Sequence, residues 1–268
     1  MTERDTAWPV GTPCWADLMT PDLDAARLFY EQLFGWHLTD LGPDAGGYLM
    51  AGVGGKQVAG LGPQQEGQAG HPAVWTTYLA TDDAAATCEA ISKAGGQVFL
   101  PAMDVMGSGV MAVAADPTGA VFGLWEAKTH TGFQLANESG SVTWNEQLSR
   151  DFEGAKQFYA DVFGYTFEDM SSGGMQYAIV QVDGNGVGGI GSMPAEVPAE
   201  VPAHWRTYFA VDDADESVNE VVRLGGTVLR PAEDMPYGRW ADVADPTGAS
   251  FSVIKPEPGP DAGDTSTG

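Results

Sequence analysis

The chain has 268 residues, of which 43% are hydrophobic and 18% are charged. That length suits two domains of ordinary size, and the composition is that of a globular protein rather than a disordered or fibrous one. The 37 Asp and Glu residues outnumber the 12 Lys and Arg residues and give a net charge of −25. Because such a charge repels phosphate backbones and anionic lipid surfaces, we expect neither nucleic-acid nor membrane partners.

The ends and the cysteines point to an intracellular protein. No apolar run approaches 18 residues, and the first ten residues have two acidic side chains and no apolar core of a signal peptide, so we expect neither a membrane span nor a leader. Cys14 and Cys88 could form one bridge at most, which fits reduced thiols better than a disulfide framework. The predicted location is the cytoplasm.

The first elements of the chain are a strand and an amphipathic helix. A strand is predicted over residues 12–19, ended by Thr20, which is a possible helix N-cap ahead of Pro21. Apolar residues spaced by three and four then predict a helix that stops at Gly35. Strands over 48–53 and 58–61 complete the first unit.

A second unit follows the same order. Asp82 or Asp83 is the expected cap of a helix over 84–94, which ends at the glycine pair 95–96. Strands are predicted over 98–101, 110–114 and 121–125. The Asp-Pro-Thr-Gly stretch at 116–119 predicts a hairpin turn.

The whole pattern recurs about 129 residues later. Trp15, Tyr48 and the 116–119 turn, for example, are repeated as Trp144, Tyr177 and residues 245–248. Within each half, a strand position followed by Asp seven residues later and Gly twenty residues later marks each unit. The four such positions are Trp15, Thr76, Trp144 and Arg206. Aligning Trp15 with Trp75 instead misses the glycine spacing by one residue and would turn every side chain to the other face.

These repeats predict an α+β protein of four βαβββ modules in two domains. The predicted boundaries are 11–127 for the first domain and 141–255 for the second. Residues 128–140 are the expected linker, because hydrophobic periodicity is weak there. Residues 256–268 are the expected disordered tail, because they are rich in Pro, Gly, Asp, Ser and Thr.

The repeated motifs W-x-[DE], FY, FG[WY], TY-x-A-x-DDA and DPTGA-x-F resemble those of the glyoxalase/bleomycin-resistance/extradiol-dioxygenase superfamily, also called vicinal oxygen chelate proteins. The resemblance covers residues 11–255. It implies that two modules pair so that their curved sheet forms a cup for a ligand or metal. It does not say whether adjacent modules pair or the first pairs with the fourth.

The resemblance also implies where a metal would be bound. In the superfamily's enzymes, ligands come from the first strand of each module and from the end of the last strand. Those positions hold Trp15, Thr76 and Gly123 in the first half, and Trp144, Arg206 and Ser252 in the second. None is a good ligand for a divalent metal, so we expect no metal site and no cofactor.

Strand alternation predicts which other side chains face the cups. Asp17 should share a face with Trp15, Glu146 with Trp144, and Arg206 with Tyr208. The candidate catalytic residues are therefore Asp17, Glu146, Arg206 and Tyr208. The candidate ligand-binding residues are Trp15, Thr76, Trp144, Tyr177, Tyr237 and Arg239. Glu146 and Arg206 could instead simply neutralise each other, and Trp75 and Trp205 should pack under the helices.

Three functions remain open. The first is metal-free binding of an aromatic or amphipathic small molecule, such as a metabolite or antibiotic, as in the drug-binding members of the superfamily. The second is a metal-independent isomerase, lyase or hydrolase in which a cup carboxylate is the general base. The third, a metal-dependent glyoxalase or dioxygenase, rests on the resemblance alone. The expected partner is a small molecule, and the chain is expected to be a monomer or a homodimer.

Overall fold

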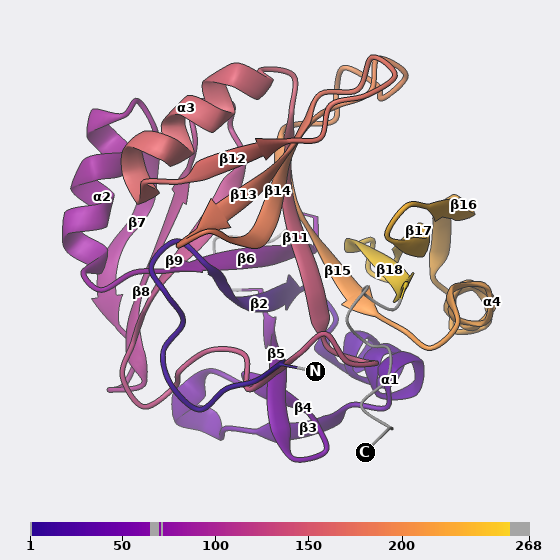
Figure 1. The fold of residues 1–268 in the computed structure, drawn as a ribbon. Coiled ribbons are helices and arrows are strands. Elements are labelled where there is room, and N and C mark those ends of the chain that lie inside the picture. Colours follow the sequence, from indigo (N-terminus) through magenta and orange to yellow (C-terminus); the bar gives the residue numbers. More distant parts are fainter. Residues whose placement is uncertain (1, 65–69, 71, 258–268) are drawn as a thin grey trace, which may run out of the picture.

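The computed structural model describes residues 2–64, 70 and 72–257. Most of these residues form two eight-stranded mixed sheets, each accompanied by two helices (Figure 1). The predicted α+β class is confirmed. No helix within the described residues is long and apolar enough to cross a bilayer.

The first sheet contains the strands of the first two modules, in the order β3-β4-β5-β2-β6-β9-β8-β7. Its strands are β2 (Pro13–Thr20), β3 (His37–Asp40), β4 (Leu49–Val53), β5 (Lys56–Pro63), β6 (Val74–Ala80), β7 (Gln97–Asp104), β8 (Gly109–Ala115) and β9 (Val121–Ala127). A short 3₁₀ helix, η1 (Pro43–Ala45), precedes β4.

The second sheet repeats this order as β12-β13-β14-β11-β15-β18-β17-β16. Its strands are β11 (Val142–Ser149), β12 (Thr166–Asp169), β13 (Tyr177–Val182), β14 (Asn185–Ser192), β15 (His204–Ala210), β16 (Thr227–Met235), β17 (Gly238–Ala244) and β18 (Ser250–Pro256). In both sheets, adjacent modules share one sheet, which answers the pairing question that the sequence left open.

The four helices are α1 (Leu23–Phe34), α2 (Ala84–Lys93), α3 (Phe152–Phe163) and α4 (Ala214–Arg223). Each is capped by an aspartate that accepts a backbone N–H three residues later, namely Asp22, Asp83, Asp151 and Asp213. The expectation that Thr20 caps α1 is wrong, because its hydroxyl contacts Asp22 and Thr247 instead.

The register predicted from the repeats is confirmed at the centre of each sheet. On the antiparallel pair β2–β6, Trp15 lies opposite Tyr78 and Asp17 opposite Thr76. On β11–β15, Trp144 lies opposite Tyr208 and Glu146 opposite Arg206. Directly opposed residues share a face, so each sheet has an inner face that carries these residues and an outer face that carries their neighbours in sequence.

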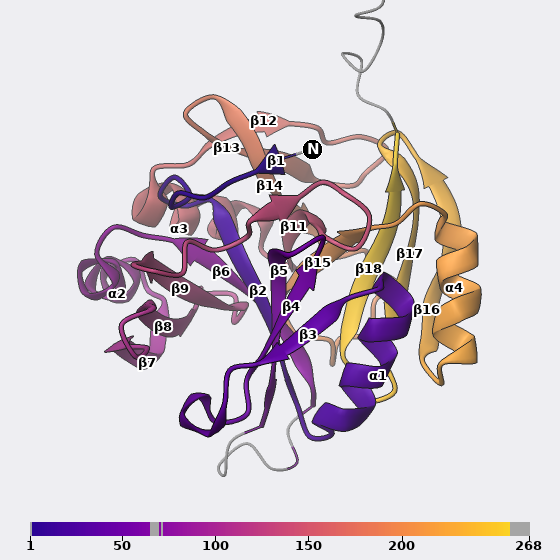
Figure 2. The same ribbon diagram turned by 90° about the horizontal axis from the view of Figure 1, so that it is seen from below.

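The helices pack on the outer faces of the sheets, and the two halves contact each other there. α1 packs beside α4, and α2 beside α3 (Figures 1 and 2). Each of the two large core clusters therefore contains side chains from both halves of the chain, for example Phe29 of α1 with Phe251 of β18 and Phe158 of α3 with Phe122 of β9.

The repeated Asp-Pro-Thr-Gly turns connect the halves through buried hydrogen bonds. The Tyr159 hydroxyl of α3 donates to Asp116 of the first half over 3.1 Å, and the Tyr30 hydroxyl of α1 donates to Asp245 of the second half over 3.1 Å. Each hydroxyl also accepts an indole N–H. The donors are Trp205 and Trp75, which lie under the helices as predicted.

The segment expected as a linker lies on the inner face of the first sheet. It includes the short strand β10 (Leu135–Ala136), which pairs with β1 (Thr2–Glu3). We refer to residues 128–136 as the covering segment. Residues 258–268 of the tail expected to be disordered lie outside the described residues, whereas Pro256 pairs with Gly238 at the end of β18.

Candidate functional site on the inner faces

Four aromatic and acidic side chains form a hydrogen-bonded cluster on the inner face of the first sheet. The indole N–H of Trp15 donates to the Tyr48 hydroxyl over 3.0 Å. The hydroxyls of Tyr48 and Tyr78 both donate to Oδ2 of Asp17, over 3.3 and 3.1 Å. Two strands, β2 and β6, and the residue that precedes β4 thus converge on one carboxyl group.

The second sheet contains the same arrangement. The indole N–H of Trp144 donates to the Tyr177 hydroxyl over 2.9 Å, and the Tyr208 hydroxyl donates to Oε1 of Glu146 over 2.6 Å. Tyr177 also lies close enough to Glu146 to lower the pKa of that carboxyl group. Trp, two Tyr and one carboxylate therefore recur as a unit in both halves, with Glu in place of Asp.

Glycines on the neighbouring strands make room for this cluster. A Cβ at Gly60 would overlap the Tyr48 hydroxyl, and one at Gly189 would overlap the Tyr177 hydroxyl. Both glycines therefore allow a tyrosine to lie flat across the strand and reach the carboxylate.

Burial makes both carboxylates weak acids. Burial raises the pKa of Asp17 to about 7, although the bonds from Tyr78 and Tyr48 oppose the shift. It also raises the pKa of Glu146, against the opposing field of Arg206 and the bonds from Tyr208 and Tyr177. Among the described residues, Oδ1 of Asp17 has no hydrogen-bond partner. Burial thus disfavours the charged form of the carboxyl group at both positions.

The covering segment closes the first inner face. The rings of His130 and Phe133 lie 4.4 and 5.5 Å from Trp15, and Trp8 packs edge-on against Phe133. His130 is itself buried, which lowers its pKa to about 4 and keeps it neutral. Trp15 is only 3% exposed as a result, so its ring is not available to a ligand in this conformation.

The second inner face is more open and more charged. Within the described chain, no aromatic ring stacks on Trp144, which is partly buried. Arg206 does not bond to Glu146, as the sequence had allowed, but pairs with Asp242 over 3.2 Å. Nε of Arg230 lies 3.7 Å from the same carboxylate, and the Arg230 guanidinium lies over the Trp240 ring.

The remaining predicted residues are distributed over both faces. Thr76 lies beside Asp17, on the inner face of the first sheet. Tyr237, half exposed in the turn between β16 and β17, lies close enough to Tyr177 to contribute to its raised pKa. Arg239 is on the outer side, where it pairs with Asp215 of α4 and with Asp234. The expectation that Arg239 contacts the ligand site is wrong, because strand alternation turns Trp240 and not Arg239 inward.

Sequence reasoning missed several inner-face residues. They are Tyr48, Tyr78, Arg230, Trp240 and Asp242. Tyr48 and Tyr78 could have been found as the repeat partners of Tyr177 and Tyr208. The other three lie on β16 and β17, whose pairing is shifted by bulges. Their counterparts in the first half are apolar, namely Leu100, Met111 and Val113, so the repeat did not mark these positions as polar.

The metal-binding positions of the superfamily do not suit a metal here. Trp15 and Trp144 use their only polar atom to donate to tyrosines. A side chain at position 123 would overlap Tyr78, and the hydroxyl of Ser252 donates to Asp242 over 2.6 Å. No group of three His, Cys, Asp or Glu side chains within the described ranges is arranged to hold a metal ion.

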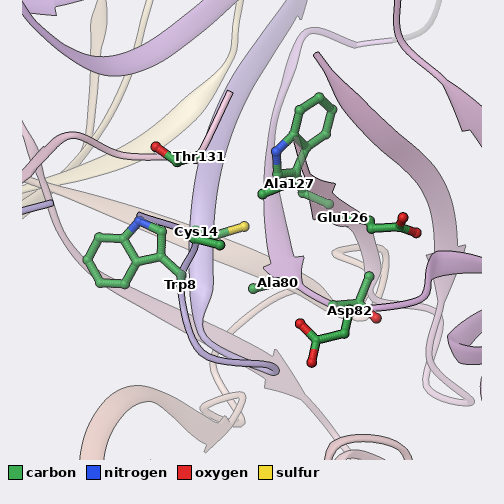
Figure 3. A pocket seen from close by; sticks show the side chains of 10 residues that line it. Trp8, Cys14, Ala80, Asp82, Glu126, Ala127 and Thr131 are labelled. Carbon is green, nitrogen blue, oxygen red and sulfur yellow. The ribbon is translucent and has the colours of Figure 1, made fainter. Parts of the chain in front are cut away.

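A cavity of about 140 Å³ lies between the N-terminal segment, the covering segment and the first sheet (Figure 3). Cys14 lies between Trp8 on one side and Glu126 and Asp82 on the other. Burial raises the pKa of the Cys14 thiol well above its usual value, so it is a poor nucleophile. The volume suits a few water molecules rather than an aromatic ligand, which needs roughly 300 Å³ or more.

Comparisons with known proteins agree on the family. The model of the Glyoxalase/Bleomycin resistance protein/Dioxygenase superfamily matches residues 14–124 and again 142–253. The protein named "Putative glyoxylase CFP32" of Mycobacterium tuberculosis is 43% identical over 253 residues, which cover 92% of this chain and 96% of that protein.

Two further similarities extend the comparison. The anthracycline biosynthesis protein DnrV of Streptomyces peucetius is 38% identical over 263 residues, which cover 93% of this chain and 95% of that protein. The crystal structure of 2,2',3-trihydroxybiphenyl 1,2-dioxygenase from Sphingomonas wittichii matches with a TM-score of 0.62 at 14% identity, covering 92% of this chain and 91% of that one. That similarity concerns the fold alone. With both halves matched, the chain belongs to the Glyoxalase/Bleomycin resistance protein/Dioxygenase superfamily.

Proposed function

We propose that this protein binds a small aromatic or amphipathic molecule without a metal, on the inner face of the second sheet. The observation that carries the proposal is the cluster of Trp144, Tyr177, Tyr208 and Glu146, in which Trp144 occupies one of the positions where the superfamily's enzymes have a metal ligand. Indole and phenol rings provide flat apolar surface, and the carboxyl group and Arg206 provide polar contacts that orient a ligand.

The comparison of the two halves supports the second sheet as the binding face. In the first sheet the equivalent tryptophan is covered by His130 and Phe133. The similarity to an anthracycline biosynthesis protein is consistent with a polycyclic aromatic ligand.

The proposal is tested by isothermal titration calorimetry of chelator-treated protein with 2-naphthol, 2-naphthoate and an anthracycline. We expect at least one of them to bind. Trp144→Ala should weaken that binding by about tenfold or more, because it removes the stacking surface and the bond that holds Tyr177. Arg239→Gln, on the outer side of β17, is the matched control and should bind like the wild type. Failure of all three ligands, or equal binding by Trp144→Ala, would contradict the proposal.

A second function, metal-independent acid–base catalysis, is supported by the raised pKa of both cluster carboxylates. A carboxylate with a pKa near neutrality can both accept and return a proton at physiological pH. Here Glu146→Gln distinguishes the two functions. Loss of ligand turnover with binding retained would favour catalysis, whereas a ligand that is bound but chemically unchanged by the wild type would favour binding alone.

A further inference from the structure

We propose that the second inner face selects aromatic ligands that carry a carboxylate group, and that Arg206 and Arg230 bind this carboxylate. This inference rests on the proposed binding function and adds the chemical class of the ligand. It is carried by two guanidinium groups that converge on a single acidic side chain in a protein with very few basic residues.

Asp242 holds the two arginines together. Its Oδ1 accepts the hydroxyl of Ser252, and its Oδ2 faces both Nη1 of Arg206 and Nε of Arg230. Asp242 is 11% exposed, whereas Arg206 is 23% and Arg230 43% exposed. The carboxylate thus lies beneath the guanidiniums, which face outward above it.

Each guanidinium has N–H groups left that can donate to an oxygen atom of a ligand. A guanidinium has five N–H groups, and Arg206 uses Nη1 for Asp242 and a further contact for Tyr208. Arg230 directs Nη1 to Glu233 over 3.0 Å and Nε toward Asp242. Planar guanidiniums bind carboxylates with two parallel hydrogen bonds, which makes this the preferred group for the remaining donors.

Besides Asp242, the side chains of Glu146, His204 and Glu233 lie near the arginine pair. Glu146 is directly opposite Arg206 on the neighbouring strand, and burial raises its pKa, which disfavours its charged form. His204 also faces this region, and its burial lowers its pKa, so it adds no charge near neutral pH. Glu233, which pairs with Arg230, is half exposed to solvent, where its field is screened.

The first half shows that these charges are not required by the fold. The repeat places Thr76, Leu100 and Val113 where the second half has Arg206, Arg230 and Asp242. Thr76 and Arg206 are also first-strand metal-ligand positions of the superfamily. Arg206 of the second sheet therefore occupies a position where the related enzymes have a residue that binds the metal. Its guanidinium can bind the oxygen atoms of a small molecule that a metal would otherwise bind.

The geometry also limits the ligand's size. Glu146 lies opposite Arg206 and Trp144 opposite Tyr208, so Trp144 and Arg206 are diagonal neighbours, roughly 7 Å apart at their backbones. A bicyclic ring with a directly attached carboxylate spans such a distance, with the ring on the Trp144 side.

The test compares 2-naphthoate with its neutral analogue 2-naphthamide by calorimetric titration of the chelator-treated full chain. We expect 2-naphthoate to bind about tenfold more tightly or better, because hydrogen bonds to charged groups are the stronger ones. Arg206→Gln and Arg230→Gln should each remove most of this preference by weakening 2-naphthoate binding much more than 2-naphthamide binding. Arg230 is half exposed, so its variant provides a test even if Arg206→Gln does not fold.

Arg239→Gln is the matched control and should keep the preference for 2-naphthoate. Equal affinity for the two probes, or a loss in Arg230→Gln that is the same for both, would overturn the carboxylate preference and leave the proposed binding function standing. Binding of neither probe would remove the basis of this inference, and the proposed function would then depend on the other ligands of its own test.

Discussion

Asp17 is a carboxyl group in a position that disfavours its charged form. Burial raises its pKa from 3.8 to about 7, so between these two values the folded chain retains a proton that the unfolded chain has lost. The free energy of unfolding therefore falls as the pH rises through this window and is constant above it. At about 1.4 kcal/mol for each pKa unit, the full effect is roughly 4 kcal/mol.

We therefore predict that Asp17→Asn gains stability relative to the wild type as the pH rises. An amide cannot ionise, so the stability difference should grow by about 3 kcal/mol between pH 5 and pH 8. Urea unfolding of both proteins at each pH measures it, and subtraction removes the contribution of all other groups. A stability difference that does not change over this range would show that Asp17 titrates normally.

At the scale of single residues, the sequence predicted much of the site. The spacing of Asp22 and Asp83 from Trp15 and Thr76 set the strand register, and alternation then put Asp17 and Glu146 on the inner faces. Arg239 was predicted to contact the ligand but lies on the outer side, because bulges on β16 obscure which residues of the β16–β17 hairpin face inward. A shift of one residue in a strand exchanges its two faces.

The covering segment is the element that distinguishes the two inner faces. Phe133 lies against Trp15, whose indole holds Tyr48 on the Asp17 carboxyl group. Sequence reasoning treated residues 128–140 as a linker, because their contacts are made by isolated side chains without strand or helix periodicity.

Phe133→Ala should destabilise the fold by about 3 kcal/mol or more, because Phe133 is buried and its removal leaves a cavity. It should also lower the pKa of Asp17, since burial is the largest cause of the raised value. The two effects appear in urea unfolding as lower stability and as a weaker pH dependence between pH 5 and pH 8.

Phe99→Ala provides the control, because Phe99, on β7, is 53% exposed. Its stability should change by roughly 0.5 kcal/mol or less. If Phe133→Ala behaved like Phe99→Ala, the covering segment would not be what keeps the first inner face dry.

The two halves form one molecule through their outer faces. The hydrogen bonds from Tyr159 to Asp116 and from Tyr30 to Asp245 join opposite halves, as do both large core clusters. The repeat in the sequence predicted both halves, but it could not predict that each half donates a hydrogen bond to the turn aspartate of the other. A turn aspartate looks the same whether its second oxygen faces solvent or a tyrosine of the other half.

We expect Tyr159→Phe to lower the stability of the whole chain, by about 1–3 kcal/mol, because it leaves the buried Trp205 indole N–H without its acceptor and removes one of the two donors to Oδ2 of Asp116, the other being Gln147. Unfolding should remain a single transition when followed by circular dichroism and by tryptophan fluorescence. Tyr237→Phe, in an exposed turn, is the control and should change little. Two separate transitions, with only one shifted by Tyr159→Phe, would mean that the halves unfold independently.

For the whole molecule, we propose that the family's fold is used for metal-free binding of an aromatic molecule. The most direct measurement is the dissociation constant of an aromatic ligand, determined by calorimetry before and after exhaustive chelation and again with added Mn²⁺ or Zn²⁺. We predict the same dissociation constant under all three conditions. Binding that is lost on chelation and restored by either metal would contradict it.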